Sequence, residues 1–372
     1  MPFRPRQNNN YRAWTIFLLA LLFTIGPALA QATDTEKKAS PLGPTQTVEQ
    51  SIDVLLGPEK EDAPEEAVSE TPPENNEPII IISDTDNGRI VIIQGINGQG
   101  YTSLGLPGFG YGRFMRPAQV WLDWDKRLYV ADSGNNRVIR VDQQSAQGWS
   151  ELEDLSTPMG VAVGKAGVYI AEMPENRIIR VKEIVADSPV LETITHPQLT
   201  RPSSLWIDAD DALYICAGED PPGGKIFKTW MEKDRRRWQI FEGDGLTGSR
   251  FRPSGIVTVK EDIKFIDGSG YRVVNMKNMQ GKRLKEQAFR NHKLWRLNRP
   301  QGVAVDETGE KFYIADSGND RILEVRADGS IVGEFFGVKG DPTSVLRNPT
   351  SVFVFNPAPK PEPEEDDDEK EK

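Results

Sequence analysis

LYVADSGNNRVIRV, residues 128–141, is the stretch that decides the fold. Leu128–Ala131 is aliphatic and aromatic without helical spacing, which is typical of a buried strand. Asp132–Asn136 predicts a tight turn, because Asp, Ser and Asn bond nearby backbone and Gly or Asn tolerates positive φ. Arg137–Val141 alternates as a half-exposed returning strand does. Upstream, Pro117–Leu122 predicts one more strand, with proline at its first position.

Both parts of this pattern recur along the chain. Strand-like runs begin at prolines spaced by 41, 44, 51, 47 and 49 residues: Pro117, Pro158, Pro202, Pro253, Pro300 and Pro349. A basic residue followed by an aliphatic one comes 19 to 23 residues after the first five prolines, at Arg137, Arg177, Lys225, Arg272 and Arg321. A period in the forties with about four short strands predicts a propeller blade, which must stack on its neighbours to bury both faces.

The two ends of the repeat region complete each other. Pro349 opens a strand, PTSVFVF, whose turn and returning strand are missing downstream. They are present in Ile79–Ile93, IIIISDTDNGRIVII, where Asp84 and Arg89 have the same spacing as Asp132 and Arg137. We therefore expect an all-β protein: a six-bladed β-propeller over residues 78–356, whose ring closes by joining the C-terminal strand to the N-terminal blade.

The repeated text resembles the NHL repeat. It combines P-x-x-V-x-V, a YVADSGNNRI-like turn and a glycine-spaced lead-in, which is clear at Gly105–Phe114. The resemblance covers about residues 78–355, is best at Pro117–Val141 and Pro300–Val325, and is weakest in blade four, where Ala217 replaces the turn acid. It implies a six-bladed propeller of a kind often used as a binding platform, although related propellers include metal-dependent lactonases and lyases.

The segments outside the repeats predict export and disorder. Basic residues before the apolar run Trp14–Leu29, with Ala28-Leu29-Ala30 at its end, indicate a signal peptide over residues 1–30, cleaved after Ala30. The expected location is therefore periplasmic or secreted, and a membrane is involved only if this segment stays uncleaved as an anchor. Residues 31–77, rich in Pro and Glu, predict a disordered acidic linker, and residues 357–372 predict a disordered acidic tail.

The negative charge of the chain lies in these two segments. The formal net charge is −11; residues 31–78 hold 12 acids against 3 bases, and residues 357–372 hold 8 acids against 3 bases. The first thirty residues add three arginines. The propeller itself is therefore close to neutral, so a basic segment within it creates a local positive field.

Signatures of catalysis and metal binding are scarce. His196 and His292 have no partners at metal-ligand spacing, and no nucleophile elbow or phosphate loop occurs. Cys216, the single cysteine, stands in the strand-like LYIC and predicts a buried thiol. We therefore assign no catalytic residue, no metal ligand and no resident cofactor.

The acids of the repeated turns allow two interpretations. They could form a ring of carboxylates that holds Ca²⁺, a cation that takes six to eight oxygen ligands. We favour the alternative that each acid caps its own turn and pairs with the arginine five residues on. The acids concerned are Asp84, Asp132, Glu172, Asp267 and Asp316.

A basic and aromatic segment, Lys277–Arg299, is the candidate binding site. Arg290–Arg299 is expected in the loop that leads into blade six, on the face that carries the acid-bearing turns. A second basic run, Lys233–Arg237, is expected on the opposite face or an outer edge. Such a field attracts an anionic partner, either a protein or an anionic envelope polymer, whereas export argues against nucleic acid. The candidate residues are Lys282, Arg283, Lys285, Arg290, Lys293, Trp295, Arg296 and Arg299.

Two functions follow from these observations. The favoured one is an exported, non-enzymatic protein-binding scaffold in the bacterial periplasm or envelope. The alternative is a calcium-dependent lactonase or lyase with its metal in the central channel. The innermost strands offer that metal only Gln119, Ser204, Gln301 and Ser351, with Asp123, Asp208 and Asp306 following three of them. Oligomeric state is not predicted.

Overall fold

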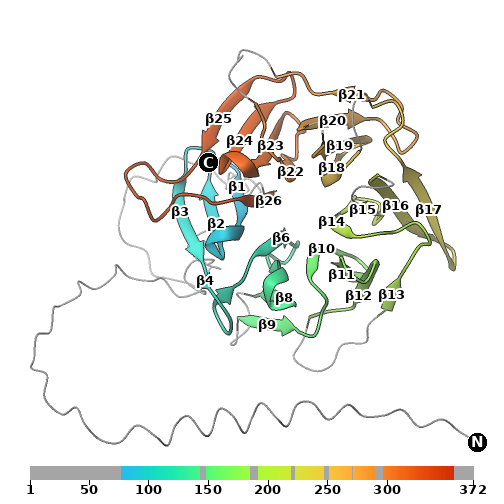
Figure 1. Cartoon of the computed structure of the whole chain (residues 1–372), viewed down its shortest axis with the longest axis horizontal. Coiled ribbons are helices and arrows are strands. Elements are labelled where there is room, and N and C mark those ends of the chain that lie inside the picture. The colour runs from blue at the N-terminus through green and yellow to red at the C-terminus, as the bar shows by residue number, and fades with distance from the viewer. Residues whose placement is uncertain are drawn as a thin grey trace, which may run out of the picture. The chain divides into compact units, whose positions relative to one another are not determined.

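Six four-stranded antiparallel sheets form a ring (Figure 1). The structure, a computed structural model, describes residues 77–142, 148–184, 192–218, 223–246, 251–269, 271–289 and 296–355. The predicted all-β, six-bladed propeller is therefore confirmed. The predictions for the signal peptide, the linker up to residue 76 and the tail from residue 356 lie outside the described residues. No helix in the described part of the chain is long and apolar enough to cross a membrane.

The four strands of each blade are named here in order from the central channel outward. Blade one contains β26 (Pro349–Phe355), β1 (Ile79–Asp84), β2 (Arg89–Gln94) and β3 (Gln99–Leu104); blade two contains β6 (Pro117–Leu122), β7 (Leu128–Asp132), β8 (Arg137–Val141) and β9 (Trp149–Leu152). Blade three contains β10 (Pro158–Gly164), β11 (Gly167–Glu172), β12 (Arg177–Val181) and β13 (Glu192–Ile194).

The remaining blades repeat this order. Blade four contains β14 (Pro202–Ile207), β15 (Leu213–Ala217), β16 (Lys225–Glu232) and β17 (Arg235–Phe241); blade five contains β18 (Pro253–Val259), β19 (Asp262–Asp267), β20 (Arg272–Met276) and β21 (Lys285–Glu286). Blade six contains β22 (Gly302–Val305), β23 (Lys311–Asp316), β24 (Arg321–Arg326) and β25 (Ile331–Phe335). A short parallel pair, β4 (Leu106–Pro107) and β5 (Arg113–Phe114), links blades one and two.

The tight turn between the second and third strands follows from the residues at its end. In blades one, two and six it is a short 3-10 turn, η1 (Thr85–Asn87), η2 (Ser133–Asn135) and η3 (Ser317–Asn319). A residue in the left-handed region ends each turn, with φ of 60° at Gly88 and 54° at both Asn136 and Asp320. Gly, Asn and Asp tolerate this conformation best, which explains why they recur there.

The ring closes as the sequence predicts. β26 pairs antiparallel with β1, placing Phe353 opposite Ile81, so the C-terminal strand is the innermost strand of blade one. In Figure 1 the red β26 lies beside the blue β1. This closure leaves no end blade with an exposed face.

The core lies between the blades. A separate cluster of buried aliphatic and aromatic side chains fills the interfaces of blades one and two, four and five, five and six, and six and one, and a larger one joins blades two, three and four. Phe114, Phe227 and Phe265 are among the largest fully buried side chains. Because every blade shares its core with both neighbours, we expect the ring to fold and unfold as a unit.

The register of the strands separates the two faces of the propeller. Pro117 pairs with Asp132 and Leu122 pairs with Leu128, so each innermost strand begins at the face that carries the acid-bearing turns and ends at the opposite one. We call the first the turn face and the second the hairpin face.

Candidate functional site

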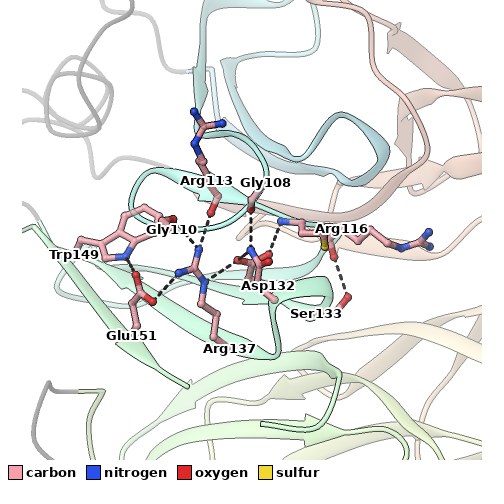
Figure 2. Close-up of polar contacts among 11 residues, drawn as sticks. Gly108, Gly110, Arg113, Arg116, Asp132, Ser133, Arg137, Trp149 and Glu151 are labelled. Atoms are coloured by element: carbon pink, nitrogen blue, oxygen red, sulfur yellow. Dashed lines mark hydrogen bonds and ion pairs between the residues drawn. The ribbon is translucent and has the colours of Figure 1, made fainter. Parts of the chain in front are cut away.

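The acid of each repeated turn is fully occupied by structural contacts, as blade two shows (Figure 2). One oxygen of the buried Asp132 carboxylate accepts the backbone N–H of Met115 at 2.7 Å. The other accepts the side-chain amide of Asn135 at 2.7 Å and Nε of Arg137 at 2.9 Å. Burial raises the pKa of Asp132, while these donors act in the opposite direction.

Arg137 connects Asp132 to the outer strand of the blade and to the lead-in loop. One of its terminal nitrogens donates to Glu151 of β9 at 2.6 Å. The other donates to the backbone carbonyls of Gly110 at 3.0 Å and Arg113 at 2.8 Å (Figure 2). A single guanidinium therefore joins the turn, the outer strand and the lead-in loop, and Arg137 as a whole is only 4% exposed.

The same arrangement recurs around the ring. Asp84 with Arg89, Asp267 with Arg272 and Asp316 with Arg321 form ion pairs of 2.7 to 2.8 Å, and Glu172 pairs with Arg177. The predicted pairing with the arginine five residues on is thus confirmed. The capping is different in detail, because Asp84, Asp132 and Asp316 bond the asparagine side chain three residues on and not a backbone N–H of the 3-10 turn.

The acids that follow three innermost strands are also structural. On the hairpin face, Asp123 accepts the backbone N–H groups of Asp125 and Arg127 at 3.0 and 2.9 Å. Asp208 and Asp306 likewise accept backbone N–H groups of the residues after them. They close their own turns, and no described residue set of three or more His, Cys, Asp or Glu side chains is placed to hold a metal.

A cavity of about 550 Å³ lies at the start of the innermost strands. Arg201, Arg252 and Arg299 line it, and we call these residues the arginine rim. Each stands immediately before the proline that begins an innermost strand. Arg201 and Arg299 have positive φ, of 48° and 49°, which turns the lead-in sharply into the strand. The rim therefore lies at the turn face, with its three side chains exposed.

The wall of the cavity contains the polar residues that the innermost strands were expected to offer. Gln119 accepts the backbone N–H of Leu205 at 3.0 Å and that of Val161 at 3.3 Å, and donates to the carbonyl of Leu205 at 2.7 Å. It therefore bridges blades two, three and four. The hydroxyl of Ser351 accepts the N–H of Val120 at 3.4 Å. Ser204 and Gln301 also line the cavity.

Aromatic rings lie deeper in the same cavity. Trp121 contacts Trp206 with ring centroids 5.1 Å apart and Phe353 with centroids 5.4 Å apart. These residues, which we call the aromatic floor, come from blades two, four and one and all line the cavity. Each occupies the fourth position after its proline, where the other blades have Ala162, Val257 and Ala304. The small side chains leave room for the large ones.

The predicted basic binding residues divide between the two faces. Arg290, Lys293 and Trp295 lie outside the described residues. The carbonyl of Arg296 accepts a bond from Asn319 of η3, which places it with Arg299 on the turn face. The other three candidates, Lys282, Arg283 and Lys285, lie in or next to the connection between β20 and β21.

That connection belongs to the hairpin face. β20 pairs Arg272 with Asp267 at the turn face and Met276 with Ile263 at the other end. The structure therefore does not bring Lys282 and Arg283 together with Arg296 and Arg299. The run Lys233–Arg237 lies at the outer β16–β17 hairpin, as expected, where Arg237 pairs with Glu232.

An exposed apolar loop, which was not predicted from the sequence, lies between blades one and two. Leu106, Phe109 and Tyr111 are 50%, 68% and 62% exposed in the lead-in between blades one and two. Asn135 donates to the carbonyl of Gly108 in this loop at 3.0 Å, which places it on the turn face. The same glycine-spaced text supported the family resemblance, and its apolar residues were the available signal.

Comparison with known proteins supports the fold. The NHL repeat family model matches residues 297–324. No curated protein matches the chain. A chain of the nidogen/laminin complex is 16% identical with a TM-score of 0.57, covering 74% of this chain and 98% of that one. Virginiamycin B lyase from Staphylococcus aureus is 17% identical with a TM-score of 0.48, covering 71% and 85%.

At 16% identity the nidogen/laminin chain shows a shared architecture and no more. The NHL match falls on the end of the lead-in and the first three strands of blade six, and the turn contacts of that blade recur around the ring. Residues 297–324 thus match the NHL repeat, and the ring of six four-stranded sheets gives this chain the architecture of a six-bladed β-propeller built from NHL-like repeats.

Proposed function

We propose that this propeller is an exported binding scaffold of the bacterial envelope that receives an acidic protein partner on its turn face. One observation carries the proposal. The acids that recur in the blades are occupied by structural contacts, whereas basic and apolar side chains of the turn face remain exposed. Exposed groups of these two kinds are what a partner surface can use.

The apolar loop is suited to this role because it is held in place. β4 and β5 pair within it, Arg137 donates to two of its carbonyls, and Tyr111 packs on Trp149 with ring centroids 5.2 Å apart. A loop that is already ordered loses little conformational entropy on binding. Phe109 can therefore act as an apolar anchor, with Arg296 and Arg299 adding charge complementarity.

The remaining parts of the proposal rest on the sequence. A signal peptide over residues 1–30 would send the protein to the periplasm or outside the cell, and the linker and tail would space it from its surroundings. An anionic envelope polymer is the second class of partner that the same charges would attract. The nidogen/laminin complex offers an example of a propeller within a protein assembly.

Charge neutralisation on one face tests the proposal. With fluorescent polyglutamate as an acidic probe in low salt, the double variant Arg296→Gln/Arg299→Gln should weaken binding by about tenfold, since each removes a charge from the turn face. The matched control Lys282→Gln/Arg283→Gln removes the same charge from the hairpin face and should change affinity less than about twofold. Equal losses in both variants, measured by fluorescence anisotropy, would contradict a turn-face site.

A further inference from the structure

We propose that the central cavity is a binding site for a small aromatic anion, with its acid group at the arginine rim and its ring against the aromatic floor. This site does not depend on a protein partner, because the cavity enters the ring itself. A volume of about 550 Å³ falls within the range typical of small-molecule sites and is far too small for a folded domain.

The positive charge of the cavity lining favours a ligand that carries an acid group. The three guanidinium groups of the rim come from consecutive blades, four, five and six. None of the described residues that line the cavity is Asp, Glu or His. The nearby turn acid of blade five, Asp267, is buried and paired with Arg272 at 2.8 Å, so it gives little negative field at the mouth. Guanidinium groups bind carboxylates and phosphates through paired N–H donors.

The distance between the arginine rim and the aromatic floor favours a ligand with a flat aromatic part beyond its acid group. Rim and floor residues stand five positions apart along the innermost strands, which corresponds to about 16 Å of extended chain. The rim arginines and the rings of the aromatic floor both line the cavity. A flat ligand with one charged end therefore contacts both layers, whereas an inorganic ion would contact only the arginine rim.

The wall supports a defined orientation. Gln119 holds its bonds to blades three and four, so the polar wall around it is braced and not free to collapse. Trp206 donates its indole N–H to Thr258 at 2.9 Å, which fixes the plane of its ring. Preformed surfaces of this kind lower the entropy cost of binding.

A charge series on one aromatic skeleton tests the proposal by calorimetry with the full chain. The probes are 2-naphthoate, 2-naphthyl phosphate, 2-naphthalenemethanol and 2-naphthylmethylammonium. We expect at least one anion to bind about tenfold or more tighter than the alcohol, as a hydrogen bond to a charged group allows, and the ammonium to bind weakest. The tighter of the two anions identifies the acid group as carboxylate or phosphate.

Variants locate the binding. Arg252→Gln should lower anion affinity about fivefold to tenfold and leave alcohol affinity unchanged, since only the charge contact is lost. Arg116→Gln is the matched control, because Arg116 also precedes an innermost-strand proline and is exposed, yet it does not line the cavity. Trp206→Phe should weaken anion and alcohol alike. Equal affinity for all four probes, no binding of either anion in the millimolar range, or equal effects of the two arginine variants would overturn the proposal.

Discussion

Deleting the chain from Pro349 onward is expected to abolish the folded propeller. β26 is the innermost strand of blade one, pairs with β1 along its length and contacts the innermost strands of blades two and six. Its removal exposes Ile80 and Ile82, which are fully buried, and reopens the ring. Each buried aliphatic or aromatic side chain that is exposed costs about 1.5–3 kcal/mol, so several together exceed the roughly 5–15 kcal/mol that stabilises a typical domain.

Circular dichroism and thermal melting check this result. The matched control ends at Asn356, so it lacks only the acidic tail, and it should melt within about 1–2 °C of the full chain because no described contact is removed. The longer deletion should show no cooperative transition. If both truncated chains melt like the full chain, the ring does not close through β26.

Removing the carboxylate of Asp132 is expected to cost about 3–5 kcal/mol of unfolding free energy, because the buried Arg137 would lose one of its two partner charges and keep only Glu151. The substitution Asp132→Ala also leaves the backbone N–H of Met115 and the amide of Asn135 without their acceptor. The double variant Asp132→Ala/Arg137→Leu should cost less than the sum of its single changes, because it removes both buried charges.

Denaturant unfolding at neutral pH measures this effect. The control is Glu232→Ala, which breaks the ion pair with Arg237, where the two side chains are 54% and 50% exposed. A pair this exposed contributes less than about 1 kcal/mol. If Asp132→Ala lowers the free energy of unfolding no more than Glu232→Ala does, the turn acid is not structural. The alternative that the turn acids bind Ca²⁺ would then be favoured.

Most of the fold could be predicted because its signals are local and repeated. Proline at the start of an innermost strand, an acid at the turn and an arginine five residues on are set by the needs of one blade. Even the closure was predictable, because the strand at Pro349 and the turn at Asp84 are each incomplete alone. The outward contact of Arg137 to Glu151 was not predicted, because it depends on how far the fourth strand runs.

The candidate site was predicted less well, for a geometrical reason. Along the chain, Arg283 and Arg296 belong to one basic segment. They lie on different faces because β21 stands between them and Arg283 precedes it at the hairpin face, whereas Arg296 contacts η3 at the turn face. Conversely, Arg201, Arg252 and Arg299 are far apart in sequence, and only the closed ring gathers them at one mouth. Each of the three stands immediately before a repeat proline, so their equivalent positions could be read from the sequence. They do not form a charged cluster along the chain, however, and clusters of charge were what the sequence prediction used.

Thermal melting of the full chain in the presence of Ca²⁺, EDTA or 2-naphthoate is the sharpest test of whether the propeller binds an anion in its central cavity. A ligand at a hundred times its dissociation constant adds about 2.7 kcal/mol, which raises the melting temperature of a domain of this size by roughly 5–10 °C. We expect that rise with 2-naphthoate, and a change below about 1 °C between Ca²⁺ and EDTA. A rise of several degrees with Ca²⁺ and none with 2-naphthoate would contradict it and favour a calcium-dependent enzyme.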